Sequence, residues 1–407
     1  MTRTESKFTS VEICAGAGGQ ALGLHQAGFR HHALIEIDKH ACATLELNVT
    51  KENGWGDCQV IPADLTTFDP AELKLEPGTL DLLAGGVPCP PFSAAGKQLG
   101  PDDERDLFPT MLNMVSFLKP KAVMIENVRG LLEPPQKFEA YREGVIKARL
   151  REEGYVICDW RVIEACDYGV PQLRPRAILV AMRPEFAGHF TWPDPKKIKL
   201  VTVAEALETT MRERFGESPE GKKAFERWHK AASGGVAPTL VGGSKKHGGA
   251  DLGPTRAKKA WLKLGVDAMG VANEPDKMTD PDRDLYSKDK SGQPLGPKLT
   301  VTQAAIIQGF PREWNFSGRK TAAYRQVGNA FPPPVARAIG EQIIVALGKG
   351  LKAPFPVKET LEREAAKEAE AARKAREAAL FELPAQSTLI SAEPADRAGD
   401  LEGAVAR

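Results

Sequence analysis

The 407-residue sequence predicts an α/β protein built around a mostly parallel, doubly wound sheet. Short apolar runs alternate with helical patterns over residues 1–183, as in chains whose parallel strands are joined by helical crossovers. The runs are nearly continuous in aliphatic residues, which is typical of strands covered by helices on both faces. A glycine-rich turn separates the first run from the first helical pattern, as at the ligand-binding edge of such sheets.

The predicted elements follow one another in strand–helix order. Strands are expected at residues 10–14, 32–37, 80–84, 122–125, 155–162 and 177–182, with one more just before Asp64. Helices are expected at residues 19–27, 40–47, 107–118, 140–152 and 334–347, and an apolar run with regular spacing covers 299–310. These elements predict a first domain over residues 1–183 that is completed by residues 321–350.

The sequence changes character near Pro184, and we expect a second, smaller and irregular domain over residues 184–320. This stretch is rich in Gly, Pro, Lys and Asp up to about residue 298. Between Lys222 and Lys263 there are ten Lys and Arg residues against two acids, and residues 242–249 read as a flexible basic loop. Such a run is either a phosphate-binding surface or a solvated face. Residues 351–407 are expected to form a charged helical and disordered tail.

Composition excludes several classes of protein. Apolar residues make up 42% and the formal net charge is +1, so overall charge does not indicate a nucleic-acid partner. The cysteines, at positions 14, 42, 58, 89, 158 and 166, lack C-x-x-C spacing, and we expect reduced thiols and no metal. No signal peptide or membrane-spanning stretch is evident in the sequence, which predicts a cytoplasmic protein.

The glycine-rich turn predicts a cofactor site. Such a turn lets the backbone approach a ligand at a helix N-terminus. Glu36, at the end of the second strand, is placed to bind a ribose diol, and Asp64, after the third, an adenine amino group. The pattern indicates a nucleoside-bearing cofactor without choosing between a dinucleotide and S-adenosylmethionine. The candidate cofactor-binding residues near these strand ends are Cys14, Ala15, Gly16, Gly18, Gly19, Glu36, Ile37, Asp64, Leu65 and Pro88.

Three further segments carry candidate catalytic residues. Cys89 lies in a proline-rich loop directly after a strand, where open α/β sheets place ligands. A free cysteine is more often a small buried hydrophobe, but its rigid loop beside a cofactor cleft favours a reactive thiol. Glu126 follows the strand 122–125 and would face the same cleft. In an extended chain Gln172, Arg174 and Arg176 share one face, and paired arginines suit phosphate or carboxylate partners.

In this order, the segments resemble the motif series of the DNA cytosine-C5 methyltransferase family. The resemblance runs from about residue 11 to 346 and includes the glycine turn, the Pro-Cys loop, Glu-Asn-Val at 126–128 and Gln-x-Arg-x-Arg at 172–176. Gln-Gly-Phe-Pro at 308–311 and Gln-Val-Gly-Asn-Ala at 326–330 complete it, and add Asn329 and Ala330 to the cofactor candidates. The family implies a Rossmann-like S-adenosylmethionine-dependent methyltransferase fold, with the target recognition domain at 184–320.

The resemblance also implies roles. Cys89 matches the nucleophile that adds to C6 of cytosine, and Glu126 the acid that bonds N3 and the amino group. Arg176 matches the arginine that holds O2, and Arg174 supports it or a phosphate. The target base must leave the duplex, and residues 92–107 match the mobile catalytic loop. DNA contacts are expected from Ser93, Lys97, Arg105, Lys245 and Lys246.

The sequence departs from the family pattern at four positions. Cys14 stands where a phenylalanine usually packs against the adenine, which leaves cofactor stacking at this position open. Pro90 replaces a commoner glutamine. Pro297 and Gln303 stand where an arginine and a glutamate are usual. None of these changes touches the matched catalytic residues.

The interpretation implies a monomer acting on double-stranded DNA at the nucleoid, with a restriction endonuclease as a possible separate counterpart. The runner-up is a tRNA cytosine-C5 methyltransferase, but no cysteine follows Cys166, whereas that branch has one in its recognition region. An amino-group methyltransferase uses no thiol and places an acid or amide where Cys89 stands. A DNA-binding protein without catalysis is the remaining alternative.

Overall fold

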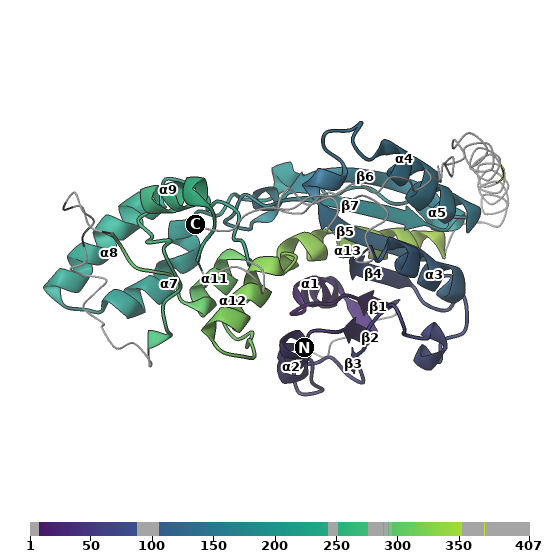
Figure 1. Cartoon of the computed structure of the whole chain (residues 1–407), viewed down its shortest axis with the longest axis horizontal. Helices are drawn as coiled ribbons and strands as arrows, with labels where there is room; N and C mark the ends of the chain where they lie inside the picture. Colours follow the sequence, from purple (N-terminus) through teal and green to yellow (C-terminus); the bar gives the residue numbers. More distant parts are fainter. Residues whose placement is uncertain are drawn as a thin grey trace, which may run out of the picture.

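The computed structural model describes residues 8–87, 106–242, 251–275 and 295–351, together with residues 288, 292 and 370. Two parts lie side by side (Figure 1). One is a twisted sheet flanked by helices, and the other is a group of helices with long connections. The predicted tail, apart from Leu351 and Glu370, lies outside the described residues.

The sheet has seven strands in the order β3-β2-β1-β4-β5-β7-β6. They are β1 (Phe8–Ile13), β2 (Phe29–Glu36), β3 (Gln59–Pro62), β4 (Leu82–Gly86), β5 (Ala122–Val128), β6 (Val156–Glu164) and β7 (Pro175–Met182). The strands β3, β2, β1, β4 and β5 pair in parallel with their neighbours. β7 runs antiparallel to both β5 and β6. The prediction of a mostly parallel sheet is confirmed, including the strand before Asp64.

Helices cover both faces of this sheet. They are α1 (Gly19–Ala27), α2 (Lys39–Asn48), α3 (Phe108–Leu118), α4 (Glu139–Tyr141), α5 (Ala148–Glu152), α6 (Pro184–Ala187) and α13 (Pro333–Gly350). Short 3-10 turns are η1 (Pro70–Leu73), η4 (Arg129–Leu131), η6 (Ala165–Tyr168) and η7 (Pro195–Lys197). The helix expected at 140–152 is divided, because the π-helical segment η5 (Arg142–Lys147) separates α4 from α5.

Alternation along the central strands explains the two covered faces. In β5, Val123 and Ile125 join the cluster packed under α3 and α5. Ala122 and Met124 join the opposite cluster, which contains residues of α1, α6 and α13. Successive side chains of a strand point to opposite faces, so a strand that is apolar throughout requires helices on both sides. The doubly wound architecture is confirmed.

The second part contains α7 (Val203–Phe215), α8 (Pro219–Ala232), α9 (Thr255–Lys263), α11 (Val301–Ile307) and α12 (Lys320–Asn329). The helices α7, α8 and α9 were not among the expected elements, whereas α11 falls within the apolar run expected at 299–310. Thr202 and Glu205 form a reciprocal capping box at α7, and the Ser218 side chain accepts from Gly221 N at α8. Such caps stabilise helix N-termini.

A shared core joins the two parts. Leu45 of α2 and Trp55 belong to the same buried cluster as Trp228 of α8 and Trp261 of α9. The Trp314 indole Nε1 donates to Ala17 O at 3.1 Å, so the segment before α12 contacts the turn that follows β1. This packing fixes the position of α12 against the carboxyl ends of β1 and β2.

Candidate functional site

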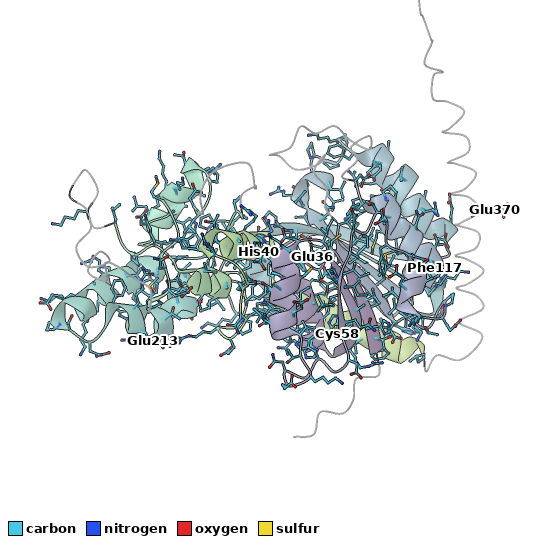
Figure 2. The ribbon with its side chains drawn as sticks, turned by 60° about the horizontal axis from the view of Figure 1, so that its bottom comes forward. Glu36, His40, Cys58, Phe117, Glu213 and Glu370 are labelled. Carbon is cyan, nitrogen blue, oxygen red and sulfur yellow. The ribbon has the colours of Figure 1, made fainter. Side chains whose placement is uncertain are left out.

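A cavity of about 580 Å³ lies where the strand ends of the sheet face α12. Strand order reverses between β1 and β4, and open α/β sheets bind ligands at this switch point. Figure 2 shows Glu36 and His40 at the junction of the two parts, whereas Glu213 lies far out on the helical part. The lining residues beyond those predicted include Glu12, Gln20, Asp38, His40, Arg325 and Phe331. Its size suits a nucleoside-bearing cofactor.

Most of the predicted cofactor residues converge on this cavity. Those that line it are Cys14, Ala15, Gly16, Glu36, Ile37, Asp64, Leu65, Asn329 and Ala330. Gly18 and Gly19 do not line it. A Cβ on Gly19 would lie 2.2 Å from Phe331 O, so this glycine permits close packing of α1 against the segment before α13.

The turn after β1 has an unusual backbone. Cys14 and Gly16 have φ values of 49° and 55°, in the left-handed region that few non-glycine residues adopt. Gly16 N donates to Glu36 Oε2 at 2.7 Å, and Ala15 N donates to Ile35 O at 3.1 Å. These bonds hold the turn against the end of β2, with the helix N-terminus of α1 behind it.

Glu36 is fixed by three backbone amides. Besides Gly16 N, its carboxylate accepts from Ile37 N at 2.9 Å and Asp38 N at 2.8 Å. Asp64, at the end of the next strand, accepts from the Thr66 hydroxyl at 2.7 Å and from Thr66 N at 2.9 Å. The Thr66 hydroxyl is the main cause that lowers the pKa of Asp64. Two oriented carboxylates therefore stand at neighbouring strand ends on the cavity wall.

Glu126 occupies the end of β5 and pairs with Arg176 of β7. Arg176 Nε lies 2.8 Å from Glu126 Oε1, and 14% of the Glu126 side chain is exposed. Burial raises the pKa of Glu126, although Arg176 and Arg174 oppose the shift. The cavity wall therefore holds a carboxyl that keeps a proton more readily than an exposed one, and Arg176 pairs with it from outside the lining residues.

Arg174 is placed differently from the expectation. Its side chain is 1% exposed, and its guanidinium donates to Leu240 O at 2.9 Å, Gly328 O at 2.8 Å and Ala330 O at 3.0 Å. A side chain buried in this way does not reach a DNA phosphate. The expectation that Arg174 contacts a phosphate is therefore corrected. Arg174 instead joins the segment before β7 to residue 240 and to the end of α12.

Replacing Arg174 by leucine is expected to lower the free energy of unfolding by about 2–5 kcal/mol, because three buried carbonyl oxygens each lose a hydrogen bond, although Ala330 O keeps the one from Gln308 Nε2. Urea unfolding followed by circular dichroism measures this loss. The matched control is Arg337→Leu on α13, because the Arg337 side chain is 55% exposed and forms an ion pair with Glu341. This substitution should change stability by about 0.5 kcal/mol or less. Equal effects of the two substitutions would contradict a joining role for Arg174.

Seven predicted residues lie outside the described part of the chain. They are Pro88, Cys89, Ser93, Lys97, Arg105, Lys245 and Lys246. Gly86 and Leu107, which lie close to residues 88 and 105 in the sequence, both line the cavity.

The sequence reasoning missed several lining residues. Glu12 lies within the expected strand 10–14, and this position gives no sign of a binding role. Gln20 directly follows the glycine turn. A polar residue on the buried side of a short apolar helix was the signal that could have identified Gln20. Arg325 and Phe331 flank the Gln-Val-Gly-Asn-Ala segment, and their positions beside it were the only sequence clue to them.

Metal clusters and membrane-spanning helices are both absent from the part of the chain that the structure describes. Across residues 8–87, 106–242, 251–275 and 295–351, no His, Cys, Asp and Glu side chains gather in a group that could hold a metal ion. Within the same part of the chain, no helix has the length and apolar character needed to cross a membrane.

Comparison with known proteins gives relatives over most of the chain. The family model described as C-5 cytosine-specific DNA methylase matches residues 8–345. The Type II methyltransferase M.NaeI of Lentzea aerocolonigenes is 52% identical over 339 residues, which are 83% of this chain and 75% of that protein. The Type II methyltransferase M.NgoMIV of Neisseria gonorrhoeae is 46% identical, over 84% of this chain and 99% of that protein.

Solved structures resemble the fold at lower identity. A putative DNA modification methyltransferase encoded within an E. coli prophage matches with a TM-score of 0.53 and 22% identity, over 84% of this chain and all of that chain. The Entamoeba histolytica methyltransferase EhMeth matches with a TM-score of 0.56 and 15% identity, over 84% and 98% of the two chains. At these identities the likeness shows a common fold.

Proposed function

This chain belongs to the C-5 cytosine-specific DNA methylase family, and from this premise we propose that it methylates C5 of a specific cytosine in double-stranded DNA through a covalent Cys89 adduct. It is a DNA (cytosine-5-)-methyltransferase with the Rossmann-like methyltransferase fold. The observation that carries the proposal is the ion pair of Arg176 with Glu126, which places a largely buried carboxyl on the cavity wall with a guanidinium directly beside it.

The residues of the cavity fit S-adenosylmethionine as the methyl donor. The Glu36 carboxylate is held by three backbone amides and retains lone pairs for a ribose diol. Ile37 is 65% exposed beside it and offers an apolar surface to an adenine ring. Asp64 and Leu65 complete the nucleoside end. When bound, the donor supplies an electrophilic methyl group.

Cys89 is the nucleophile by its motif, and the other thiols support this by elimination. Burial is the main cause that raises the pKa of the described cysteines, to about 12 at Cys14, Cys58 and Cys158 and about 11 at Cys42 and Cys166. The thiolate is the reactive form of cysteine, so these five thiols are poorly suited to attack. Of the six cysteines of the chain, this leaves Cys89.

In the proposed reaction the Cys89 thiolate forms a bond to C6, and the electron pair of the C5–C6 double bond makes C5 nucleophilic. Glu126 donates a proton to N3 and accepts a hydrogen bond from the amino group, while Arg176 holds O2. C5 then bonds the methyl group, whose bond to sulfur breaks. Loss of the C5 proton to a base expels the Cys89 thiolate and restores the double bond, while N3 returns its proton to the Glu126 carboxylate.

We assign DNA recognition to residues 184–320 and catalysis to residues 1–183 with 321–350. The target cytosine leaves the duplex to reach the cavity, because its ring atoms are covered by stacking. Ser93, Lys97 and Arg105 would contact DNA from the loop that carries Cys89, and Lys245 and Lys246 from the insert. As the relatives are named Type II methyltransferases, we propose a monomer that marks nucleoid DNA in a restriction–modification system, with a separate endonuclease.

The test is incubation of the protein with labelled S-adenosylmethionine and either duplex DNA or tRNA. Label is expected in DNA, as 5-methylcytosine at one sequence that bisulfite sequencing then identifies. Label that appears only in tRNA would overturn the proposal in favour of a tRNA cytosine-C5 methyltransferase. Label on the exocyclic amino group would overturn the covalent route.

A further inference from the structure

Two polar side chains at the inner end of the cavity are buried without full hydrogen bonding. Gln20 is 4% exposed and Glu12 is 1% exposed, and both line the cavity. Within the described part of the chain, neither atom of the Gln20 amide has a hydrogen-bond partner, and Glu12 Oε2 has none. Buried polar groups are nearly always paired, so these atoms indicate a ligand that pairs with them.

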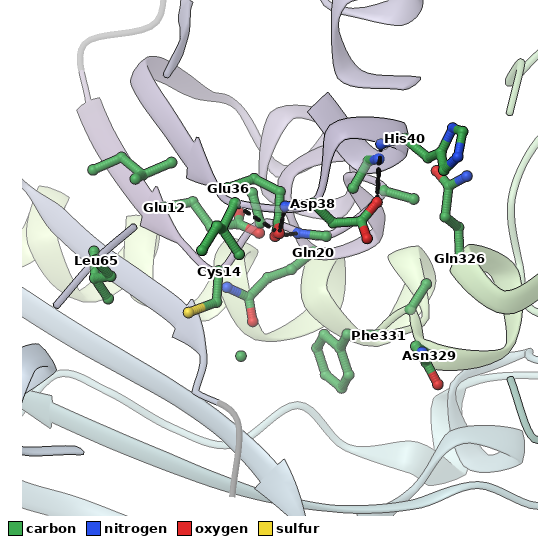
Figure 3. A pocket seen from close by; sticks show the side chains of 18 of the residues that line it. Glu12, Cys14, Gln20, Glu36, Asp38, His40, Leu65, Gln326, Asn329 and Phe331 are labelled. Atoms are coloured by element: carbon green, nitrogen blue, oxygen red, sulfur yellow. Dashed lines mark hydrogen bonds between the residues drawn. The ribbon is translucent and has the colours of Figure 1, made fainter. Parts of the chain in front are cut away.

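The sheet order places this pair between two functional ends. Glu36 is the last residue of β2, and Asp64 follows β3. Glu126 lies near the carboxyl end of β5, and Glu12 belongs to β1, which lies between β2 and β5 in the sheet. Gln20 extends from α1 toward Cys14 (Figure 3). A donor with its ribose at Glu36 and its methyl group toward Glu126 would carry its third branch, the amino-acid end, past β1.

We propose that Gln20, together with Glu12, binds the charged amino-acid end of S-adenosylmethionine and makes the site specific for donors that carry it. The inference rests on the proposed cofactor and deepens it. The Gln20 amide can accept from the α-ammonium group through Oε1 and donate to the α-carboxylate through Nε2. Glu12 Oε2 accepts a second hydrogen bond from the ammonium group.

The charges of the site agree with this assignment. The cavity is lined by the carboxyl groups of Glu12, Glu36, Asp38, Asp64 and Glu126, with Arg325 and His40 as the basic side chains among its described lining residues. Burial raises the pKa of Glu12 well above its ordinary value, and the neighbouring Gln20 side chain and Ala21 backbone amide offset only part of that shift. A neighbouring ammonium group favours the charged carboxylate and would offset that burial.

The experiment compares two ligands by isothermal titration calorimetry. S-Adenosylhomocysteine carries the amino-acid end, and 5′-methylthioadenosine lacks it. Gln20→Leu is expected to weaken binding of S-adenosylhomocysteine about 10- to 100-fold, the range for hydrogen bonds to charged groups, and to leave 5′-methylthioadenosine within about twofold. Glu36→Ala is the matched comparison on the same cavity, and it should weaken both ligands because both carry the ribose.

Stability separates binding from a structural role. Gln20→Leu replaces an unpaired buried amide by an apolar group of similar size, so the ligand-free variant should unfold at the same or a higher temperature than wild type. Gln20→Glu, which loses the donor, should weaken S-adenosylhomocysteine as well. Unchanged affinity in Gln20→Leu, or equal losses for both ligands, would overturn the inference. Absence of S-adenosylhomocysteine binding to wild type would instead overturn the proposed cofactor, and the inference with it.

Discussion

Replacing Cys89 by serine is expected to abolish DNA methylation, with a fall in turnover of about 10⁴-fold or more, as when a covalent nucleophile is removed. A serine hydroxyl is not ionised near neutral pH and does not add readily to C6 of cytosine. Binding of S-adenosylhomocysteine should remain within about twofold of wild type, because the donor is expected to be held by other side chains. Turnover with labelled donor and calorimetry measure the two effects separately.

Covalent trapping gives this prediction a second readout. DNA that carries 5-fluorocytosine at the target position has no C5 proton to lose, so wild-type protein should form a complex that survives denaturing electrophoresis. Cys89→Ser should form none. The control is Cys158→Ser on β6, because burial raises the pKa of the Cys158 thiol to about 12 and it does not line the cavity. Near-normal turnover in Cys89→Ser would rule out the covalent mechanism.

The parallel sheet could be predicted because its signal is local. Each central strand is a short apolar run, and burial on both faces makes such runs continuous. The cavity was predictable for a related reason. Glu36 is the last residue of β2, Asp64 closely follows β3 and Glu126 lies near the carboxyl end of β5, and the carboxyl ends of parallel strands share one edge of the sheet. Strand-end position therefore brought together acids that lie far apart in the sequence.

The surroundings of Arg174 could not be predicted in this way. Its partners are carbonyl groups at residues 240, 328 and 330. Every residue has a backbone carbonyl, so the sequence does not indicate which of them will accept a hydrogen bond. The partners of Gln172 were equally unpredictable from the sequence. Its side-chain amide donates to Gln308 Oε1 at 2.8 Å and accepts from Leu240 N at 2.7 Å. Alternation fixes the face of a side chain, but tertiary packing decides whether that face meets solvent or another segment.

The helices of residues 203–232 had a local signal that composition concealed. The Gly, Pro and Lys residues around these helices are typical of irregular structure. Thr202 and Glu205 nevertheless have the spacing of a capping box. Val203, Leu207 and Met211 then recur on one buried face. Summed composition averages over such short patterns, whereas helix formation depends on the cap and the face.

Glu126→Gln is the second substitution with a large expected effect. The amide cannot transfer a proton to N3, so turnover should fall by about 10²- to 10⁴-fold, the range for a positioned general acid. Its size and its contact with Arg176 are retained, so the fold and binding of S-adenosylhomocysteine should change little. Single-turnover methylation of duplex DNA measures the loss, and Glu133→Gln, whose side chain is 38% exposed after β5, serves as the control.

The pH dependence tests the role of Glu126 more sharply than the rate alone. Burial raises its pKa above that of an ordinary glutamate, so the proton-bearing carboxyl persists to higher pH than it would in water. A rate that needs this form falls as pH rises through the raised pKa, and stays high below it. Glu126→Gln should lose that limb of the profile, because glutamine does not titrate. A variant that keeps the wild-type profile at reduced rate would show that another group supplies the proton, and that Glu126 acts only by holding Arg176.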